Sequence, residues 1–203
     1  MSSAGPAGIG VLGSAFNPPH LGHLALAQEA LWQLGLEEVI LMPTGSAPHK
    51  RIADDPGKEA RMEMTRLATA EDDRFSVSGL EVGREGPSYT YETLEALAEE
   101  RGDRELVFVM GADAAVGLES WRNPERVVEL ASLAVARRPG VSDAEVGETM
   151  RSLGCEGRVT MLEMPQFGVS SSVARERAKQ GRPLRYLVPD AVADFIAERG
   201  IYR

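Results

Sequence analysis

Short apolar runs alternate along this chain with segments in which apolar residues recur every three or four positions. The short runs predict buried strands, and the three-four spacing predicts helices with one apolar face. The predicted strands are 9–12, 38–42, 75–82, 106–110, 133–136 and 159–162. The predicted helices are 24–34, 58–70, 90–100, 144–153, 173–179 and 189–199, and another begins at Asn123-Pro124, where a cap residue precedes a proline.

Strands that alternate with helices are typical of a parallel sheet covered on both faces. We therefore predict an α/β fold, a doubly wound parallel sheet with helices on both faces and a helical C-terminal part at about 168–203. A length of 203 residues, with 43% hydrophobic and 26% charged residues, suits a single domain over 1–203. Ligands of such sheets bind beyond the carboxyl ends of the strands, which directs attention to the segments after Leu12, Met42 and Met110.

The segment 13–23, Gly-Ser-Ala-Phe-Asn-Pro-Pro-His-Leu-Gly-His, contains two of the three histidines. It joins the first strand to the first helix, and a helix N-terminus offers unpaired N–H groups and a positive dipole end to an anion. His20 and His23 lie three residues apart and would share one face of the first helical turn. A lone turn histidine is typical of a cap or a surface residue, whereas this pair indicates a phosphate site.

The charge balance narrows the choice of ligand. A net charge of −9 argues against nonspecific nucleic-acid binding, which depends on basic surface. A small nucleotide can still bind where basic residues gather, and the candidates are Lys50, Arg51, Arg138 and Arg175. No apolar run approaches the roughly 20 residues of a membrane span, and residues 1–8 lack signal-peptide features. We expect no membrane association and a cytoplasmic location.

Two residues have plain structural interpretations. Cys155 is the single cysteine, so it cannot form an internal disulfide, and we interpret it as structural or incidental. Trp32, on the first predicted helix, is assigned to the core. The sequence leaves the oligomeric state open, and a homo-oligomer is among the expected states.

The segment 13–23 resembles the nucleotidylyltransferase signature G-x-F-x-P-x-H-x-G-H. The family usually has paired glycines before Thr-Phe, whereas this chain has Gly13-Ser14-Ala15-Phe16. Asn17 stands where the bacterial nicotinate mononucleotide branch commonly has aspartate. Neither departure removes a histidine. The resemblance implies a Rossmann-like fold that binds ATP at this segment.

Four further segments look like the bacterial nicotinate mononucleotide adenylyltransferase pattern, in the expected order. Residues 43–50 are similar to the substrate loop, whose basic residue approaches bound phosphate. Residues 87–94 match the segment that receives the nicotinate carboxylate, with Thr90 as donor. Residues 111–113 resemble the G-x-D that holds ribose hydroxyls. Each has a plain alternative on its own, such as a solvated loop lysine or a helix cap.

The third segment continues, eight residues after Asp113, to the Trp121-Arg122 pair, and the fourth segment completes the resemblance. Trp121 corresponds to a tryptophan that stacks on the pyridine ring, a contact that suits a flat heterocycle. Arg122 departs from the aromatic residue that the bacterial branch often has there. Residues 169–175 resemble I-S-S-T-x-x-R and imply a second phosphate clamp, because serines at a helix start and an arginine one turn later all favour an anion.

The resemblance implies three sets of functional residues. The catalytic residues are His20, His23 and Arg175. The residues expected to bind ATP are Gly13, Ser14, Phe16, His20, His23, Gly111, Asp113, Ser170, Ser171, Ser172 and Arg175. The residues expected to bind the second substrate are Thr44, Lys50, Thr90, Trp121, Arg122 and Arg138.

The implied reaction is in-line attack by the phosphate of nicotinate mononucleotide on the α-phosphorus of ATP, which releases pyrophosphate. No covalent nucleophile is evident, and the attacking phosphate is already ionised. Mg²⁺ is expected to arrive with the phosphates, without a dedicated metal site. The alternatives are nicotinamide mononucleotide or pantetheine phosphate as the acceptor, or a nucleotide-binding module without turnover. A metallohydrolase lacks a third ligand at plausible spacing.

Overall fold

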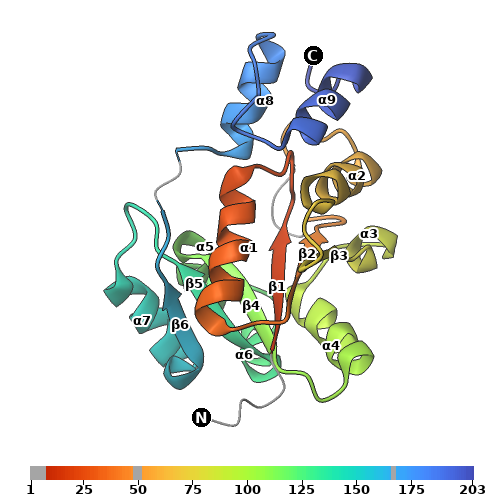
Figure 1. The fold of residues 1–203 in the computed structure, drawn as a ribbon. Helices are drawn as coiled ribbons and strands as arrows, with labels where there is room; N and C mark the ends of the chain where they lie inside the picture. The colour runs from red at the N-terminus through yellow and green to blue at the C-terminus, as the bar shows by residue number, and fades with distance from the viewer. Residues whose placement is uncertain (1–7, 48–51, 166–167) are drawn as a thin grey trace. The chain divides into compact units, whose positions relative to one another are not determined.

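The computed structural model describes residues 8–47, 52–165 and 168–203, with the helices and strands drawn in Figure 1. The strands are β1 (Ile9–Ser14), β2 (Glu38–Pro43), β3 (Phe75–Val77), β4 (Leu106–Gly111), β5 (Ala131–Ala136) and β6 (Val159–Leu162). The helices are α1 (Leu21–Leu34), α2 (Lys58–Thr69), α3 (Leu80–Gly83), α4 (Thr90–Arg101), α5 (Ala112–Val116), α6 (Pro124–Leu130), α7 (Asp143–Ser152), α8 (Ser171–Lys179) and α9 (Asp190–Arg199). Within these ranges, no helix is both long and apolar enough to cross a membrane.

The strands form one parallel sheet in the order β3-β2-β1-β4-β5-β6, which confirms the predicted fold class. Phe108 on β4 lies opposite Val11 on β1 and opposite Leu133 on β5. These strands are almost entirely buried. Their residues are apolar in continuous runs because both faces of a parallel sheet are covered. The strand order reverses between β1 and β4, and open sheets bind ligands beyond the carboxyl ends of the strands at such a switch point.

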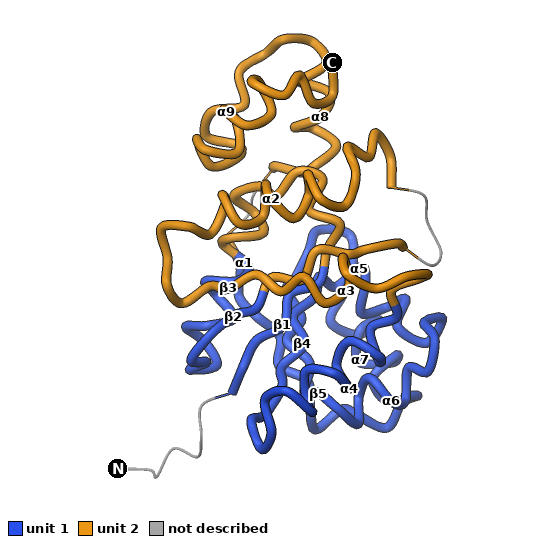
Figure 2. The backbone as a smooth tube through the Cα atoms, turned by 90° about the vertical axis from the view of Figure 1, so that its right-hand side faces the viewer, with its two compact units in different colours: residues 1–13, 26–40, 89–164 blue, residues 14–25, 41–88, 165–203 orange. Residues whose placement is uncertain are grey.

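The chain divides into two compact units, coloured separately in Figure 2. Unit 1 comprises residues 1–13, 26–40 and 89–164, and unit 2 comprises 14–25, 41–88 and 165–203. Unit 2 has its own hydrophobic cluster from α2, α8, α9 and the segment between the last two helices, formed by Met64, Ala174, Ala178, Leu184, Val188, Val192 and Ile196. The C-terminal helices are therefore packed elements, as the helical pattern after residue 168 predicts.

The prediction of one strand over 75–82 is wrong. The strand ends at Val77, and Leu80–Gly83 forms the short helix α3. Ser78 explains the break, because its Oγ accepts the N–H of Leu80 at 3.3 Å. Such a local side-chain bond offers the backbone an alternative to the extended ladder.

The assignment of Trp32 to the core is also wrong, since its side chain is 78% exposed. The buried residues of α1 are Leu26, Ala27 and Ala30. At 100° per residue, Trp32 lies on the far side of the helix from Ala30. The apolar type of the residue suggested burial, but its phase on the helix decides exposure.

Candidate functional site

The turn between β1 and α1 brings His20 and His23 into contact. His20 directly precedes α1 and is 7% exposed, and His23 lies in the first helical turn. Their rings stack, with centroids 3.8 Å apart and 27° between the planes. Phe16 packs against the His23 ring edge-on, at 4.9 Å. The predicted histidine pair is therefore one compact group, held by an aromatic neighbour.

His23 has its two ring nitrogens in different environments. Its Nδ1 accepts the backbone N–H of His20 at 3.2 Å, and its Nε2 lies 3.3 Å from Ser14 Oγ. A nitrogen that accepts from an N–H carries a lone pair, so the proton of the neutral ring lies on Nε2. The backbone thus fixes the tautomer in which Nε2–H is a donor, the form that can bind a phosphoryl oxygen.

Gly22 lies close to the ring of His20. A Cβ at this position would lie 3.1 Å from both Nδ1 and Cε1 of His20. That separation is closer than most real contacts of a Cβ, and His20 is buried, so the ring has little room to move. The glycine between the two histidines allows their rings to stack.

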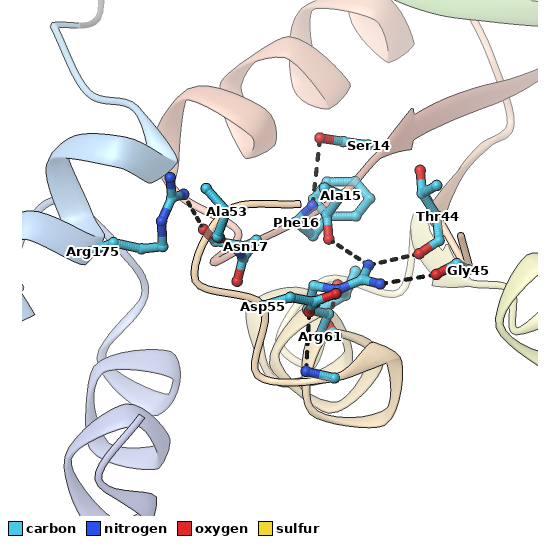
Figure 3. Close-up of polar contacts among 12 residues, drawn as sticks. Ser14, Ala15, Phe16, Asn17, Thr44, Gly45, Ala53, Asp55, Arg61 and Arg175 are labelled. Atoms are coloured by element: carbon cyan, nitrogen blue, oxygen red, sulfur yellow. Dashed lines mark hydrogen bonds and ion pairs between the residues drawn. The ribbon is translucent and has the colours of Figure 1, made fainter. Parts of the chain in front are cut away.

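The predicted second clamp, at the start of α8, contacts the histidine turn within unit 2. Ser171 Oγ donates to the carbonyl oxygen of Pro18 at 2.8 Å. Arg175 donates to the carbonyl oxygen of Asn17 at 2.8 Å, a contact drawn in Figure 3, and to Ser172 Oγ at 3.3 Å. Ser170 caps the helix, because its side chain accepts the N–H of Val173. The two motifs therefore meet, although they are about 150 positions apart in the sequence.

Arg175 also has an acidic neighbour that the sequence analysis did not identify. Its Nε lies 3.3 Å from a carboxylate oxygen of Asp54, and Lys179 Nζ lies 2.8 Å from the other. Hydrogen bonds from Lys179, and then from Arg175, hold the pKa of the Asp54 carboxyl below its usual range. Asp54 is therefore anionic at neutral pH and orients the arginine beside the turn.

Asn17, the departure from aspartate, uses both ends of its amide. Its Nδ2 donates to the carbonyl oxygen of Ala53 at 2.7 Å, and its Oδ1 accepts the hydroxyl of Tyr202 at 2.6 Å. The side chain is 2% exposed, and burial raises the pKa of the Tyr202 phenol. The C-terminal segment is thereby joined to the turn, and a carboxylate could serve only one of the two partners.

We expect the Asn17→Asp variant to lose about 1–3 kcal/mol of unfolding free energy at pH 7, since it leaves a buried carbonyl without its donor. The new carboxyl can donate to Ala53 only when protonated, so folding raises its pKa. The stability deficit should then shrink as the pH falls through that pKa and be complete above it. Denaturant unfolding of both proteins at several pH values measures this difference.

The control for this prediction is Tyr202→Phe, which removes only the hydroxyl. We expect it to cost about 1 kcal/mol, with no pH-dependent difference from the wild type between pH 4 and 7. An Asn17→Asp variant as stable as the wild type at pH 7 would contradict the role given to the amide donor.

The loop after β2 is held to the segment before α4. Ser88 Oγ accepts the N–H groups of Gly45 and Ser46, at 3.2 and 3.3 Å, and Ser88 N–H donates to the carbonyl oxygen of Ser46. Thr44 N–H donates to the carbonyl oxygen of Ser14 at 2.9 Å, which links this loop to the histidine turn. Thr44 therefore lies next to the predicted ATP segment, while Lys50 and Arg51 are outside the described residues.

Unit 1 carries the predicted contacts to the nucleoside parts. Asp113, in the first turn of α5, pairs with Arg138 at 3.5 Å, and a Cβ at Gly111 would meet both side chains. The half-buried Trp121 contacts Phe108 edge-on, with ring centroids 6.0 Å apart. Arg122 is exposed, and so is Gly13, which follows the buried residues of β1. Thr90 is the first residue of α4 and Tyr89 precedes it as the cap, so the alternative of Thr90 as the helix cap is not seen.

The predicted residues thus fall into two groups, one in each unit. Unit 2 brings together the phosphate-handling residues, namely Ser14, Phe16, His20, His23, Ser170, Ser171, Ser172 and Arg175, and it holds Thr44. Unit 1 holds Gly13, Thr90, Gly111, Asp113, Trp121, Arg122 and Arg138. The sequence analysis missed Arg61, whose buried side chain bonds to the loops after β1 and β2. The sequence offers no signal for this role, because three of the partners of Arg61 are backbone oxygens.

Comparisons with known proteins show the family of this chain. The model of the family described as "Cytidylyltransferase-like" matches residues 11–177. A "Probable nicotinate-nucleotide adenylyltransferase" of Symbiobacterium thermophilum is 43% identical over 196 residues, covering 96% of this chain and 94% of the relative. A relative of the same name from a Synechococcus strain is 40% identical, with the same coverage.

A solved structure shares the fold. It is a Plasmodium falciparum nicotinic acid mononucleotide adenylyltransferase, determined in complex with APC and with NaAD. The TM-score is 0.78 for each complex, the identities are 15% and 16%, and 97% of each chain is covered. At this identity the likeness concerns the fold, and it extends over almost the whole chain.

Proposed function

The chain belongs to the cytidylyltransferase-like family, and we propose that it transfers the adenylyl group of ATP to nicotinate mononucleotide, forming nicotinate adenine dinucleotide and pyrophosphate. The observation that carries this proposal is the stacked pair of His20 and His23, in contact with Ser14 and beside the start of α8. These groups can donate hydrogen bonds to a phosphate that binds at the end of the first strand. The relatives at 40% identity and above have names that state this activity.

The phosphate-handling residues supply positioning and charge stabilisation. The Nε2–H of His23 donates to an oxygen of the transferring phosphoryl group. His20 and Arg175 stabilise the charge on the leaving pyrophosphate. Ser171 and Ser172 present hydroxyls at the N-terminus of α8, which favours anions. The acceptor phosphate attacks directly, so the new P–O bond forms as the bond to pyrophosphate breaks, without an enzyme-bound intermediate. The remaining contacts proposed for ATP are Gly13, Ser14, Phe16, Gly111, Asp113 and Ser170.

Magnesium belongs to this proposal as a companion of ATP. In the part of the chain that the structure describes, no three His, Cys, Asp or Glu side chains are grouped to hold a metal ion. The donors around the histidine turn are imidazole, hydroxyl and guanidinium groups, which bind phosphate oxygens. We propose that Mg²⁺ enters on the phosphates, where it neutralises their charge.

Trp121 and Thr90 are the residues that we propose select a pyridine nucleotide as the acceptor. We propose that the indole stacks on the pyridine ring and that Thr90 donates to the nicotinate carboxylate, with Thr44, Lys50, Arg122 and Arg138 as further acceptor contacts. Phe108 packs against the indole with 80° between the ring planes, a contact that helps to orient the indole.

We expect Trp121→Ala to raise the KM for nicotinate mononucleotide about 10- to 50-fold, with kcat changed by less than about threefold, because stacking is equal in the ground and transition states. Initial rates over a range of nucleotide concentrations measure both constants. Trp121→Phe should retain most of the affinity. An unchanged KM in Trp121→Ala would mean that the tryptophan only packs against Phe108 and does not bind the substrate.

The test of the function is pyrophosphate release from ATP and Mg²⁺ with three acceptors at equal concentration. The acceptors are nicotinate mononucleotide, nicotinamide mononucleotide and pantetheine phosphate. We expect at least a tenfold preference for the first. A preference for another acceptor would retain the phosphate-handling roles and overturn those of Thr90 and Trp121. No release with any acceptor would make the chain a nucleotide-binding module. A cytoplasmic location and a homo-oligomeric state remain predictions.

A further inference from the structure

Arg61 is a buried cation that no part of the reaction yet uses. It lies on α2 with 0% exposure, the largest of the fully buried side chains among the described residues. Its Nε donates to Asp55 at 2.9 Å, and Nη1 donates to the carbonyl oxygens of Ala15 and Thr44, at 2.9 and 2.6 Å. Its Nη2 donates to the carbonyl oxygen of Gly45 at 3.2 Å. Figure 3 shows the guanidinium bonded to the carbonyl oxygens of Ala15, Thr44 and Gly45.

The acceptors explain why a charge is buried here. Taking a guanidinium out of water is costly, and replacing a buried ion pair by apolar residues is often neutral or stabilising. Stability alone therefore gives no reason for an arginine at position 61. Three of its four partners are backbone oxygens, and these belong to two loops, one after β1 and one after β2. The side chain therefore fixes the spacing between the two loops.

Those two loops carry the two substrates in the proposed function, on which this inference rests. Ala15 lies inside the ATP segment, between Ser14 and Phe16, and Thr44 and Gly45 begin the acceptor loop. The loops also touch directly, through the N–H of Thr44 and the carbonyl oxygen of Ser14 at 2.9 Å. A change in their spacing would move the acceptor phosphate relative to the α-phosphorus of ATP.

We propose that Arg61 is a positioning residue for the adenylyl transfer, which holds the ATP segment and the acceptor loop at the separation that in-line attack requires. It acts through the carbonyl oxygens of Ala15, Thr44 and Gly45 and touches no reacting atom. A planar guanidinium reaches these acceptors in fixed directions, whereas an ammonium is a point charge on a flexible stem. Misplacement by about 1 Å can lower a rate about 100-fold, so the effect belongs mainly to kcat.

The first test is Arg61→Lys, which keeps the positive charge and loses the planar set of hydrogen-bond donors. We expect kcat to fall about 30- to 100-fold and both KM values to change less than about threefold, assayed well below the melting temperature of the variant. Arg66→Lys is the matched control, on the same helix with 61% of its side chain exposed, and should behave as the wild type. A folded Arg61→Lys protein with kcat within twofold of the wild type would overturn the proposal.

A second variant separates positioning from folding. In Arg61→Ala, added guanidinium ion at a few tens of millimolar, far below denaturing concentrations, can fill the vacated site. We expect it to raise kcat at least tenfold, with no gain for the wild type or for His23→Ala. A kcat that guanidinium leaves unchanged, while it restores the melting temperature, would make Arg61 structural only.

The activity of the wild type separates a failure of the proposed function from a failure of the positioning role of Arg61. If it uses another acceptor than nicotinate mononucleotide, the variants are compared with that acceptor, and the positioning role stands or falls by the same ratios. If the wild type releases no pyrophosphate with any acceptor, the proposed function fails and the positioning role fails with it. Normal wild-type turnover with an unaffected Arg61→Lys removes only the role of Arg61.

Discussion

Replacing His23 by alanine is expected to lower kcat about 100- to 1,000-fold and to change the KM for ATP by no more than a few-fold. The reason is that a preorganised donor aimed at developing charge contributes on this scale, and mainly in the transition state. The Nδ1 of His23 already accepts the backbone N–H of His20, so its Nε2–H is the donor available to phosphate. Initial rates of pyrophosphate release over a range of ATP concentrations give both constants.

Two conservative variants test which nitrogen of His23 matters. His23→Asn places a polar atom near the position of Nδ1 and has none near Nε2, whereas His23→Gln reaches the Nε2 position and loses the acceptor for the N–H of His20. We expect His23→Gln to retain at least tenfold more kcat than His23→Asn, although His23→Asn should be the more stable protein. The reverse order of activity would assign the effect to the backbone contact.

The control for the histidine series is Trp32→Ala, on the same helix, whose side chain is 78% exposed. Truncating an exposed side chain on a solvent-facing helix position should leave kcat unchanged and alter the unfolding free energy by about 0.5 kcal/mol or less. A His23→Ala protein that keeps its rate within a few-fold of the wild type would remove His23 from the catalytic residues.

The elements that could be predicted are those whose pattern is local. Apolar runs such as 106–110 marked buried strands because both faces of a parallel sheet are covered, and the structure confirms them. The predicted strand over 75–82 failed where the hydroxyl of Ser78 bonds to the N–H of Leu80, a competition that alternation of residue types does not reveal. The assignment of Trp32 to the core is wrong because its position around the helix, and not its apolar type, decides its exposure.

In the candidate site, the motifs could be predicted from the sequence, but the residues that hold these motifs in place could not. His20, His23 and Arg175 are recognisable because their spacing within short segments is part of the signature. The partners of Asn17 are not, since Tyr202 lies 185 positions away and the contact depends on how α8 and α9 pack. Arg61 joins positions 15, 44 and 45 through backbone oxygens, which leave no trace in residue identity.

Gly45→Ala is expected to have the largest effect on stability. An ideal Cβ at this position would lie 2.1 Å from the carbonyl oxygen of Glu81 and 2.8 Å from its carbonyl carbon. Both are backbone atoms, so no side-chain rotation relieves the clash. Gly45 cannot move away cheaply either, because its N–H donates to Ser88 and its carbonyl oxygen accepts from Arg61. The strain must therefore displace the acceptor loop from α3.

We expect Gly45→Ala to lose about 3 kcal/mol or more of unfolding free energy, at the upper end of overpacking effects, and to melt about 6–12 °C lower. Gly147→Ala in α7 is the matched control, since a Cβ there meets no atom within 4 Å and alanine favours a helix interior. It should be neutral or up to about 1 kcal/mol more stable. Because the displaced loop is also held by Arg61, kcat should also fall at least tenfold in the folded Gly45→Ala protein. If both variants melt alike, the close approach of Gly45 to Glu81 does not hold this loop.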